Sequence, residues 1–272
     1  MRGDIDLTAY LKRIGFGARP AADLATLAAL HRLHPMAIPF ENLSTLLREP
    51  IPLDIPALED KLVARGRGGY CFEHNTLFAE VLRAIGFEVV GLAARVVWGR
   101  RAAGPPGPRS HMVLRVSAGG EDYISDVGFG GLTLTGPLKL ELDTEQETPH
   151  ERFRLRRVGD ELELEARVEG DWRPLYRFDL QVHLPIDFDV LNHFVATHPS
   201  SHFLTTLIAA RRTAEGRFAL SNNRLAVYRG TVKEERKLCS GAEIARVLTD
   251  EFQIALPRGE ALDSKLAAFA AQ

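Results

Sequence analysis

The sequence predicts an α+β fold, because the spacing of apolar residues changes twice along the chain of 272 residues. In the first part, apolar residues recur every three or four positions, which is typical of one face of a helix. From Glu88 onward they alternate with polar residues, as in strands, and in the last third both patterns occur. We therefore divide the chain into a helical part, a β part and a mixed part, at residues 1–86, 87–188 and 189–272.

Three helices are expected before Cys71. An aspartate that can cap a helix, or a proline that favours its first turn, stands at the start of each one. A glycine or a proline follows the first two and ends them. The expected ranges are 7–14 between Asp6 and Gly15, 20–34 between Pro20 and Pro35, and 54–64 from Asp54.

A fourth helix is expected to begin at Cys71 and to end at Gly86. A thiol at a helix N-terminus lies near unpaired backbone N–H groups and the positive end of the helix dipole, and both favour the reactive thiolate. Cys71 is therefore a candidate nucleophile, although free cysteines are also common as small buried residues. The apolar face of this helix consists of Leu77, Phe78, Val81, Leu82 and Ile85.

Strands and hairpins are expected in the second part. Residues 89–97 are rich in β-formers, and 102–108 form a loop of prolines and glycines that no strand accommodates. Gly119-Gly120 predicts a hairpin between strands 112–117 and 123–127.

A second hairpin is marked by charge and turns at Gly159-Asp160. We expect its alternating arginines and glutamates to pair across a solvated face: Arg152, Arg154 and Arg156 on one arm, Glu161, Glu163 and Glu165 on the other. The mixed part is expected to contain a helix at 189–196, strands at 203–211, 217–220 and 225–229, and a helix capped by Ser240 and Glu243.

The composition argues against several classes of function. A net charge of −2 disfavours a nucleic-acid partner held mainly by phosphate contacts. No apolar stretch is long enough to span a bilayer and the first residues lack the apolar core of a signal peptide, so we expect a cytoplasmic protein. Cys71 and Cys239 are expected to be free thiols. No metal is expected, because Pro199 interrupts any helix between His198 and His202.

Three residues can supply the chemistry of acyl transfer through a thiol, which needs a nucleophile, a base and a group that orients the base. In chain order they are Cys71, His111 and Asp126. The residues alone leave alternatives open. His74 lies one helical turn beyond Cys71 and is another candidate base. Asp126 is also suited to cap the glycine turn that follows it.

Five strings of residues follow one another between residues 39 and 201: Pro39-Phe40-Glu41-Asn42-Leu43, Arg67-Gly68-Gly69-Tyr70-Cys71-Phe72-Glu73-His74-Asn75, Ser110-His111-Met112-Val113, Asp126-Val127-Gly128-Phe129-Gly130, and Asn192-His193-Phe194 leading into His198-Pro199-Ser200-Ser201. In this order they resemble the arylamine N-acetyltransferase family, bacterial type. The resemblance implies an N-terminal helical bundle, a central β-barrel and a C-terminal α/β lid around a cysteine-protease-like core. It also implies that Cys71, His111 and Asp126 form the catalytic triad.

The resemblance implies binding residues as well. It places Gly128, Phe129, Gly130 and Gly131 beside the pyrophosphate or pantetheine of coenzyme A, with Thr133 and Thr135 as further polar contacts. From the residues alone this stretch is a tight turn, and no Gly-Lys-Ser/Thr follows it. Phe40, Phe129 and Phe203 are candidates to line an aromatic acceptor pocket, with ordinary core packing as the alternative. The resemblance favours the pocket for Phe40 and Phe203.

Arg67 and Glu41 lie within two of these strings and are candidates for structural support. A buried arginine needs a carboxylate partner. Our hypothesis is that the two residues pair and brace the loop that bears Cys71.

The resulting expectation is an enzyme that transfers acetyl from acetyl-CoA to arylamines, arylhydrazines or N-arylhydroxylamines, in xenobiotic metabolism. The reaction would be a double displacement through an acetyl-cysteine. Acetyl-CoA is a co-substrate, and neither metal nor flavin is expected; the protein would be a monomer or homodimer. The alternatives are an amide synthase of a biosynthetic pathway, a cysteine hydrolase or transglutaminase-like enzyme, and a non-enzymatic binding module.

Overall fold

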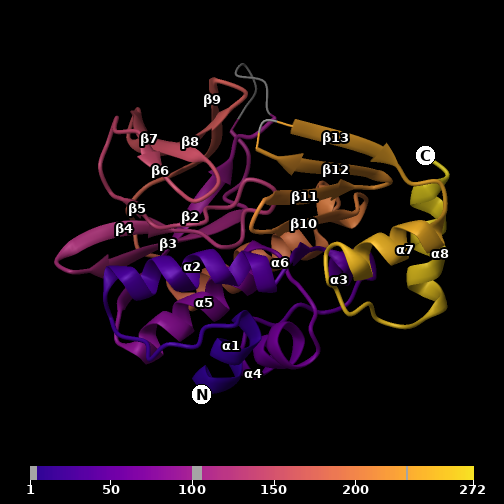
Figure 1. Ribbon diagram of the computed structural model, residues 1–272, viewed down its shortest axis with the longest axis horizontal. Coiled ribbons are helices and arrows are strands. Elements are labelled where there is room, and N and C mark those ends of the chain that lie inside the picture. Colours follow the sequence, from indigo (N-terminus) through magenta and orange to yellow (C-terminus); the bar gives the residue numbers. More distant parts are fainter. Residues whose placement is uncertain (1–4, 100–105, 231) are drawn as a thin grey trace.

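A computed structural model describes residues 5–99, 106–230 and 232–272 of the chain. Within them, two antiparallel sheets lie side by side above the N-terminal helices (Figure 1). The last two helices pack against one face of the second sheet. No helix in the described ranges is long and apolar enough to cross a membrane. The mixed α/β architecture is the one that the sequence predicts.

Helix α1 (Leu7–Ile14) has the predicted bounds. The Asp6 carboxylate accepts the Ala9 N–H at its start, and Gly15 ends it with a φ of 72°. Helix α2 (Leu24–Ala37) differs from the prediction at both ends. It begins after Asp23, whose side chain accepts a backbone N–H and so caps the helix better than Pro20 does. It also continues through Pro35, which stands in the last turn, where the missing N–H removes only one helical hydrogen bond.

The third predicted helix is confirmed as one helical run in two forms. After a short helix α3 (Leu43–Leu46), helix α4 (Ile55–Leu58) starts at the Asp54 cap and continues directly into a π-helical segment, Glu59–Ala64. Helix α5 (Cys71–Ile85) is confirmed at both ends, and Gly86 terminates it with a φ of 112°. Cys71 is therefore the first residue of α5.

The first sheet has eight strands in the order β5-β4-β3-β2-β9-β8-β7-β6. It is nearly closed into a barrel, because the Gln146 side chain at one edge bonds both backbone groups of Lys139 at the other, at 2.8 and 2.9 Å. The strands are β2 (Glu88–Val96), β3 (His111–Ala118), β4 (Glu121–Ser125), β5 (Leu138–Lys139), β6 (Gln146–Glu147), β7 (Arg152–Val158), β8 (Glu161–Val168) and β9 (Asp171–Phe178).

Both predicted hairpins form. Gly119 and Gly120 turn between β3 and β4 with positive φ, and Arg154 pairs with Glu165 across β7 and β8 at 2.6 Å. The charged face is not fully solvated, however. Glu163 and Glu165 are each only 6% exposed. Glu163 pairs with Arg177 of the unpredicted strand β9, and the Arg154 guanidinium that pairs with Glu165 lies over Trp172 of the same strand. Of the predicted loop 102–108, residues 102–105 lie outside the described residues, and 106–108 have no regular structure.

The second sheet combines one strand of the N-terminal helical part with four strands of the last third of the chain. Its order is β1-β10-β11-β12-β13, and β1 (Phe40–Glu41) from the helical part pairs with β10 (Ile208–Arg212). The remaining elements are α6 (Pro185–Thr197), β11 (Gly216–Ser221), β12 (Arg224–Arg229), β13 (Val232–Lys237), α7 (Gly241–Asp250) and α8 (Glu260–Ala270). The sequence did not predict β13 or α8.

Phe203 marks a wrong boundary in the mixed part. It lies in a 3₁₀ turn, His202–Leu204, and the strand begins only at Ile208. Hydrogen bonds from the Asn42 side chain to the Phe203 and Thr206 carbonyls hold this turn against the N-terminal part, which local sequence could not indicate. The predicted boundary at 86 coincides with the end of α5, whereas 188 falls inside α6, and the division into three domains stays a prediction.

Candidate active site

Cys71 lies where α5 meets both sheets. It is the first helical residue and is 3% exposed. The Glu73 carboxylate accepts the Tyr70 N–H at 3.1 Å and so fixes the start of the helix. Gly128 packs on the other side, and a Cβ there would stand only 2.9 Å from the Cys71 Cα. The turn after Asp126 therefore approaches the thiol as closely as only glycine allows.

His111 opens β3 and faces both other candidates. Its Nε2 lies 2.7 Å from Oδ2 of Asp126, so Nδ1 is the ring nitrogen left to interact with the nearby Cys71 thiol. Sγ of Cys71 also lies 3.7 Å from the Ser110 carbonyl oxygen. Burial by itself lowers the pKa of His111. The charge and hydrogen bond of Asp126, with the contact to Cys71, outweigh burial and raise the pKa to about 10. The geometry thus favours an imidazolium next to the sulfur at neutral pH.

Asp126 follows the last residue of β4 and is fully buried. Burial tends to raise its pKa, but His111 and the hydrogen bonds to its carboxylate lower the pKa below the usual range. Oδ1 accepts the Gly128 N–H and the Asn75 amide, each at 2.9 Å. Asp126 therefore both orients His111 and caps the glycine turn, the two roles that the sequence left open.

Asn75 was missed by the sequence analysis as a site residue. From α5, one turn after Cys71, its amide donates to the Met112 carbonyl and to Asp126, and its oxygen accepts the Val127 N–H. One side chain thus ties together the segments that carry all three triad candidates. An amide does not titrate, so the only available signal was its position four residues after Cys71 in the quoted string.

His74, the alternative base, points away from the thiol. Its Nδ1 bonds Nε2 of His34 at 2.8 Å, and its Nε2 lies 3.0 Å from the Gly69 carbonyl and 3.2 Å from that of Pro39. Burial lowers its pKa to about 4. Both ring nitrogens are occupied inside the helical part, so the structure brings His111 and not His74 to Cys71.

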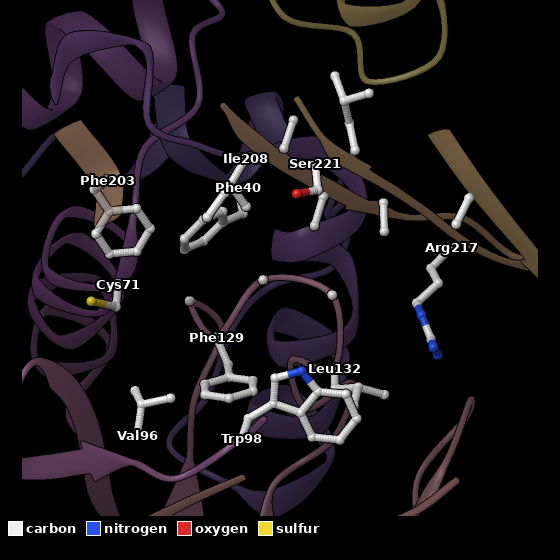
Figure 2. Close-up of a pocket in the computed structure, with 18 of the residues that line it drawn as sticks. Phe40, Cys71, Val96, Trp98, Phe129, Leu132, Phe203, Ile208, Arg217 and Ser221 are labelled. Atoms are coloured by element: carbon white, nitrogen blue, oxygen red, sulfur yellow. The ribbon is translucent and has the colours of Figure 1, made fainter. Parts of the chain in front are cut away.

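A cavity of about 520 Å³ opens beside Cys71. Figure 2 shows Cys71 next to Phe203 at one end, with Phe129 and Trp98 along one wall and Arg217 toward the other end. The three phenylalanines of the predicted acceptor pocket all line it, and Phe40 and Phe203 lie 6.2 Å apart between ring centroids. The opposite wall is the inner face of the second sheet, including Ile208, Ala210, Ala219 and Ala226.

The predicted coenzyme A contacts divide into two groups. Gly128, Phe129, Gly130 and Gly131 all line the cavity. Thr133 and Thr135 are buried behind it. The Thr133 hydroxyl donates to the Asp126 carbonyl and accepts the Phe129 N–H, and the Thr135 hydroxyl bonds Thr148. Thr133 supports the turn, and neither threonine lines the cavity.

The far end of the cavity carries the charged side chains Arg217, Arg224 and Glu235. The Arg217 guanidinium lies 2.6 Å from Glu151 and 3.7 Å from the centroid of the Tyr228 ring. Glu151 also holds Arg212 at 2.8 Å, so one carboxylate serves two arginines. A positive charge is thus fixed in place at this end.

Arg67 and Glu41 form a buried pair. The guanidinium contacts Oε1 of Glu41 through Nε at 2.9 Å and through Nη2 at 2.7 Å, and Oε2 accepts the Leu43 N–H. Between Arg67 and the Cys71 helix, a Cβ on Gly68 would lie 2.1 Å from the Pro39 carbonyl oxygen. The pair joins β1 to the segment before α5. Its effect on Cys71 stays a prediction.

Cys239 is exposed. Within the described residues, no cluster of three or more histidine, cysteine or acidic side chains is arranged to hold a metal ion.

Comparison with known proteins places the chain among acetyltransferases. A family model described as N-acetyltransferase matches residues 23–261. An arylamine N-acetyltransferase of Mycolicibacterium smegmatis is 46% identical over 255 residues, 93% of each chain. The arylamine N-acetyltransferase / N-hydroxyarylamine O-acetyltransferase of Salmonella typhimurium is 39% identical over 90% of this chain and 88% of its own. The structure of Mycobacterium marinum arylamine N-acetyltransferase in complex with CoA matches with a TM-score of 0.94 at 41% identity, covering 97% of this chain and 99% of that one.

Proposed function

The chain belongs to the arylamine N-acetyltransferase family, and on that premise we propose that it transfers acetyl from acetyl-CoA to aromatic amines, arylhydrazines or N-arylhydroxylamines through an acetyl-cysteine at Cys71. The observation that carries this mechanism is the contact of Cys71 with His111, and of His111 with Asp126, at the edge of one large cavity. Nucleophile, base and orienting carboxylate are adjacent, and the cavity gives two substrates access to the same sulfur in turn.

In the first half-reaction, the Cys71 thiolate attacks the thioester carbonyl carbon. The tetrahedral intermediate collapses, the carbon–sulfur bond to coenzyme A breaks, and His111 donates a proton to the departing thiolate. Cys71 then carries the acetyl group. As the first residue of α5, Cys71 has a backbone N–H without a helical acceptor, and this donor is suited to the developing oxyanion.

In the second half-reaction, the amine nitrogen attacks the acetyl-cysteine carbonyl. His111, now neutral, accepts the proton of the amine, and the Cys71 thiolate leaves. The imidazolium–thiolate pair is restored. Asp126 favours the protonated form of His111 in this pair. Protons and bonds balance over the cycle without a metal or a flavin.

The donor is proposed to lie along the cavity. The pantetheine would pass Gly128–Gly131, where the glycines leave room for it, and the phosphates would lie toward Arg217 and Arg224. The acceptor is proposed to stack among Phe40, Phe129 and Phe203 close to the sulfur, since aromatic faces favour a planar amine. We further expect the protein to act in the cytoplasm as a monomer or homodimer.

Intact-protein mass spectrometry tests the proposal. The protein is incubated with acetyl-CoA and no acceptor, alongside Cys71→Ala and, as a matched control, Cys239→Ser. One acetyl group on the wild type and on Cys239→Ser, absent from Cys71→Ala and discharged by an anisidine, is the expected result. Absence of acetylation would overturn the acetyl-CoA assignment. Discharge by water as fast as by the amine would favour the hydrolase alternative instead.

A further inference from the structure

Asp126 is held by hydrogen bonds at each of its polar atoms. Its carboxylate binds His111, Asn75 and the Gly128 N–H, and its carbonyl accepts the Thr133 hydroxyl. Its backbone N–H lies just beyond the end of β4, where the strand ladder no longer provides an acceptor. That N–H donates to Nε2 of His31 at 3.0 Å.

His31 comes from α2, a helix that contributes no residue to the cavity lining. The ring is fully buried and meets Phe78 edge-on, with 5.8 Å between centroids. Because a backbone N–H donates to Nε2, that nitrogen must carry a lone pair, and the proton of the neutral ring is on Nδ1. Beyond the backbone of His31 itself, Nδ1 has no hydrogen-bond partner among the described residues.

Burial keeps His31 neutral. It lowers the pKa of His31 to about 4, against the opposing attraction of the Asp126 charge. A protonated His31 would point an N–H at the Asp126 N–H, break the bond and place a second cation beside the carboxylate. The neutral ring leaves His111 as the cation that Asp126 binds.

We propose that His31 is a positioning residue for the acyl transfer, which holds the Asp126 carboxylate in register with His111 by accepting the Asp126 N–H. Without that acceptor, the turn after β4 relaxes, Asp126 withdraws from His111, and the imidazolium–thiolate pair loses support. The proposal rests on the proposed function, but it concerns the reactivity of the thiol, which can be measured without acetyl-CoA.

Other titratable groups face this network and belong in the design. His34, on the same helix as His31, binds Tyr10 and His74 and does not touch Asp126. Tyr176 of β9 packs on His111 at 4.8 Å between centroids and also faces Asp126. Burial and the Asp126 carboxylate raise the pKa of Tyr176 well above the usual range, so it stays neutral. Of the groups around Asp126, His111 is therefore the one whose charge this carboxylate supports directly, and Cys71 is the thiol whose reactivity reports on it.

The experiment is the pH profile of Cys71 alkylation by iodoacetamide, in a Cys239→Ser background so that one thiol reacts. His31→Leu removes the acceptor, and His31→Gln keeps a side-chain oxygen that can accept. Tyr10→Phe is the matched control, because it removes one buried hydrogen bond to α2 without touching Asp126. His31→Leu should shift the profile to higher pH and slow alkylation at neutral pH about tenfold, the effect of one buried hydrogen bond. His31→Gln should restore much of the rate.

A folded His31→Leu protein with the wild-type profile would overturn the proposal, as would equal shifts in His31→Leu, His31→Gln and Tyr10→Phe. Should His31→Leu not fold, ¹⁵N spectra of histidine-labelled wild-type protein decide. His31 should remain neutral, with Nε2 as acceptor, from about pH 5.5 to about pH 8. A protonated ring, or a proton on Nε2, in that range overturns the proposal. If the variants shift the alkylation profile as expected but acetyl-CoA does not acetylate Cys71, the proposed function is refuted and this inference stands.

Discussion

The two sides of Cys71 are built differently. On the helical side, buried polar groups are linked in a continuous series, Tyr10 to His34 to His74, and Asn75 and His31 hold Asp126. On the cavity side, the sulfur faces aromatic rings and small apolar residues, and the charged side chains Arg217, Arg224 and Glu235 lie at the far end. The comparison suggests that the helical side sets the reactivity of the thiol and the cavity side selects what reaches it. Substitutions on the two sides should therefore have separable effects.

Asp126→Asn should have the largest effect. The amide keeps the shape of the carboxylate but removes the charge that raises the pKa of His111, so the imidazolium is lost at neutral pH. Acetylation of Cys71, followed by stopped-flow mass spectrometry, should slow about 10³- to 10⁴-fold. Asp122→Asn, in the strand β4 that precedes Asp126, weakens part-exposed interactions with Arg115 and Ser117 and serves as the control. Equal rates for the two variants would remove the carboxylate from the mechanism.

Glu41→Gln should destabilise the fold next most strongly. It leaves the Arg67 guanidinium buried without a counter-charge, which costs about 3–5 kcal/mol. Urea unfolding measures the change, and the acetylation rate shows whether the pair also braces the Cys71 loop. Glu145→Gln, at an exposed arginine pair, should change little. Unchanged stability together with unchanged activity in Glu41→Gln would refute the bracing hypothesis.

Acid should destabilise the helical side. Burial lowers the pKa of His31 and His74 to about 4, and of His34 well below its usual value, so the unfolded chain binds more protons than the native chain as pH falls below about 6.5. The stability gained by burying these neutral rings is fully present above that pH and is lost as the pH falls toward 4. Between pH 6.5 and pH 5, protonation linked to His31 and His74 should lower the free energy of unfolding by about 3 kcal/mol in total.

His111 acts in the opposite direction. Its pKa is raised to about 10, so its contribution to stability is complete below about pH 6.5 and is lost as the pH rises through 10. Urea unfolding across this range should therefore give maximum stability near neutral pH. His74→Gln should reduce the acid slope, and the exposed His193→Gln should not. A flat profile between pH 5 and 6.5 would contradict neutral burial of these rings.

Phe203→Leu should have the smallest effect, confined to the cavity side. Loss of one aromatic contact worth about 0.5–1.5 kcal/mol should slow discharge of the acetyl-enzyme by an arylamine about three- to tenfold. Acetylation by acetyl-CoA should stay at the wild-type rate. Phe218→Leu is the control, since Phe218 packs on Phe252 away from the cavity. A slower first half-reaction in Phe203→Leu would show that the two sides of Cys71 are not separable.

Local sequence signals were sufficient where the physics is local. Asp6, Gly15 and Gly86 mark helix ends by backbone hydrogen bonding alone, and the Gly119-Gly120 turn needs only its positive φ angles. The catalytic candidates were recognisable because a family resemblance added information that residue spacing lacks. Spacing left both His74 and His111 as candidate bases, and only the fold shows that His111 is the one that faces Cys71.

The remaining features depend on contacts between distant parts of the chain. His31 reaches Asp126 across 95 positions, and Asn42 binds the turn of Phe203 across 161. Glu163 looked solvated in its hairpin, but a strand that arrives later covers it. Pro35 signalled a helix end that packing of α2 against α5 and β10 overrides. The local sequence around such residues is the same whether or not the fold brings a distant partner into contact with them.

The chain contains two tryptophans, and the fold gives them different surroundings. Trp172 lies under the Arg154 guanidinium on the barrel, whereas Trp98 is 45% exposed and lines the cavity beside Phe129. Excitation of a Trp172→Phe protein would thus produce emission from the indole at the cavity wall alone. Its wavelength and quenching provide an optical titration of donor and acceptor binding, free of chemical labels and independent of turnover.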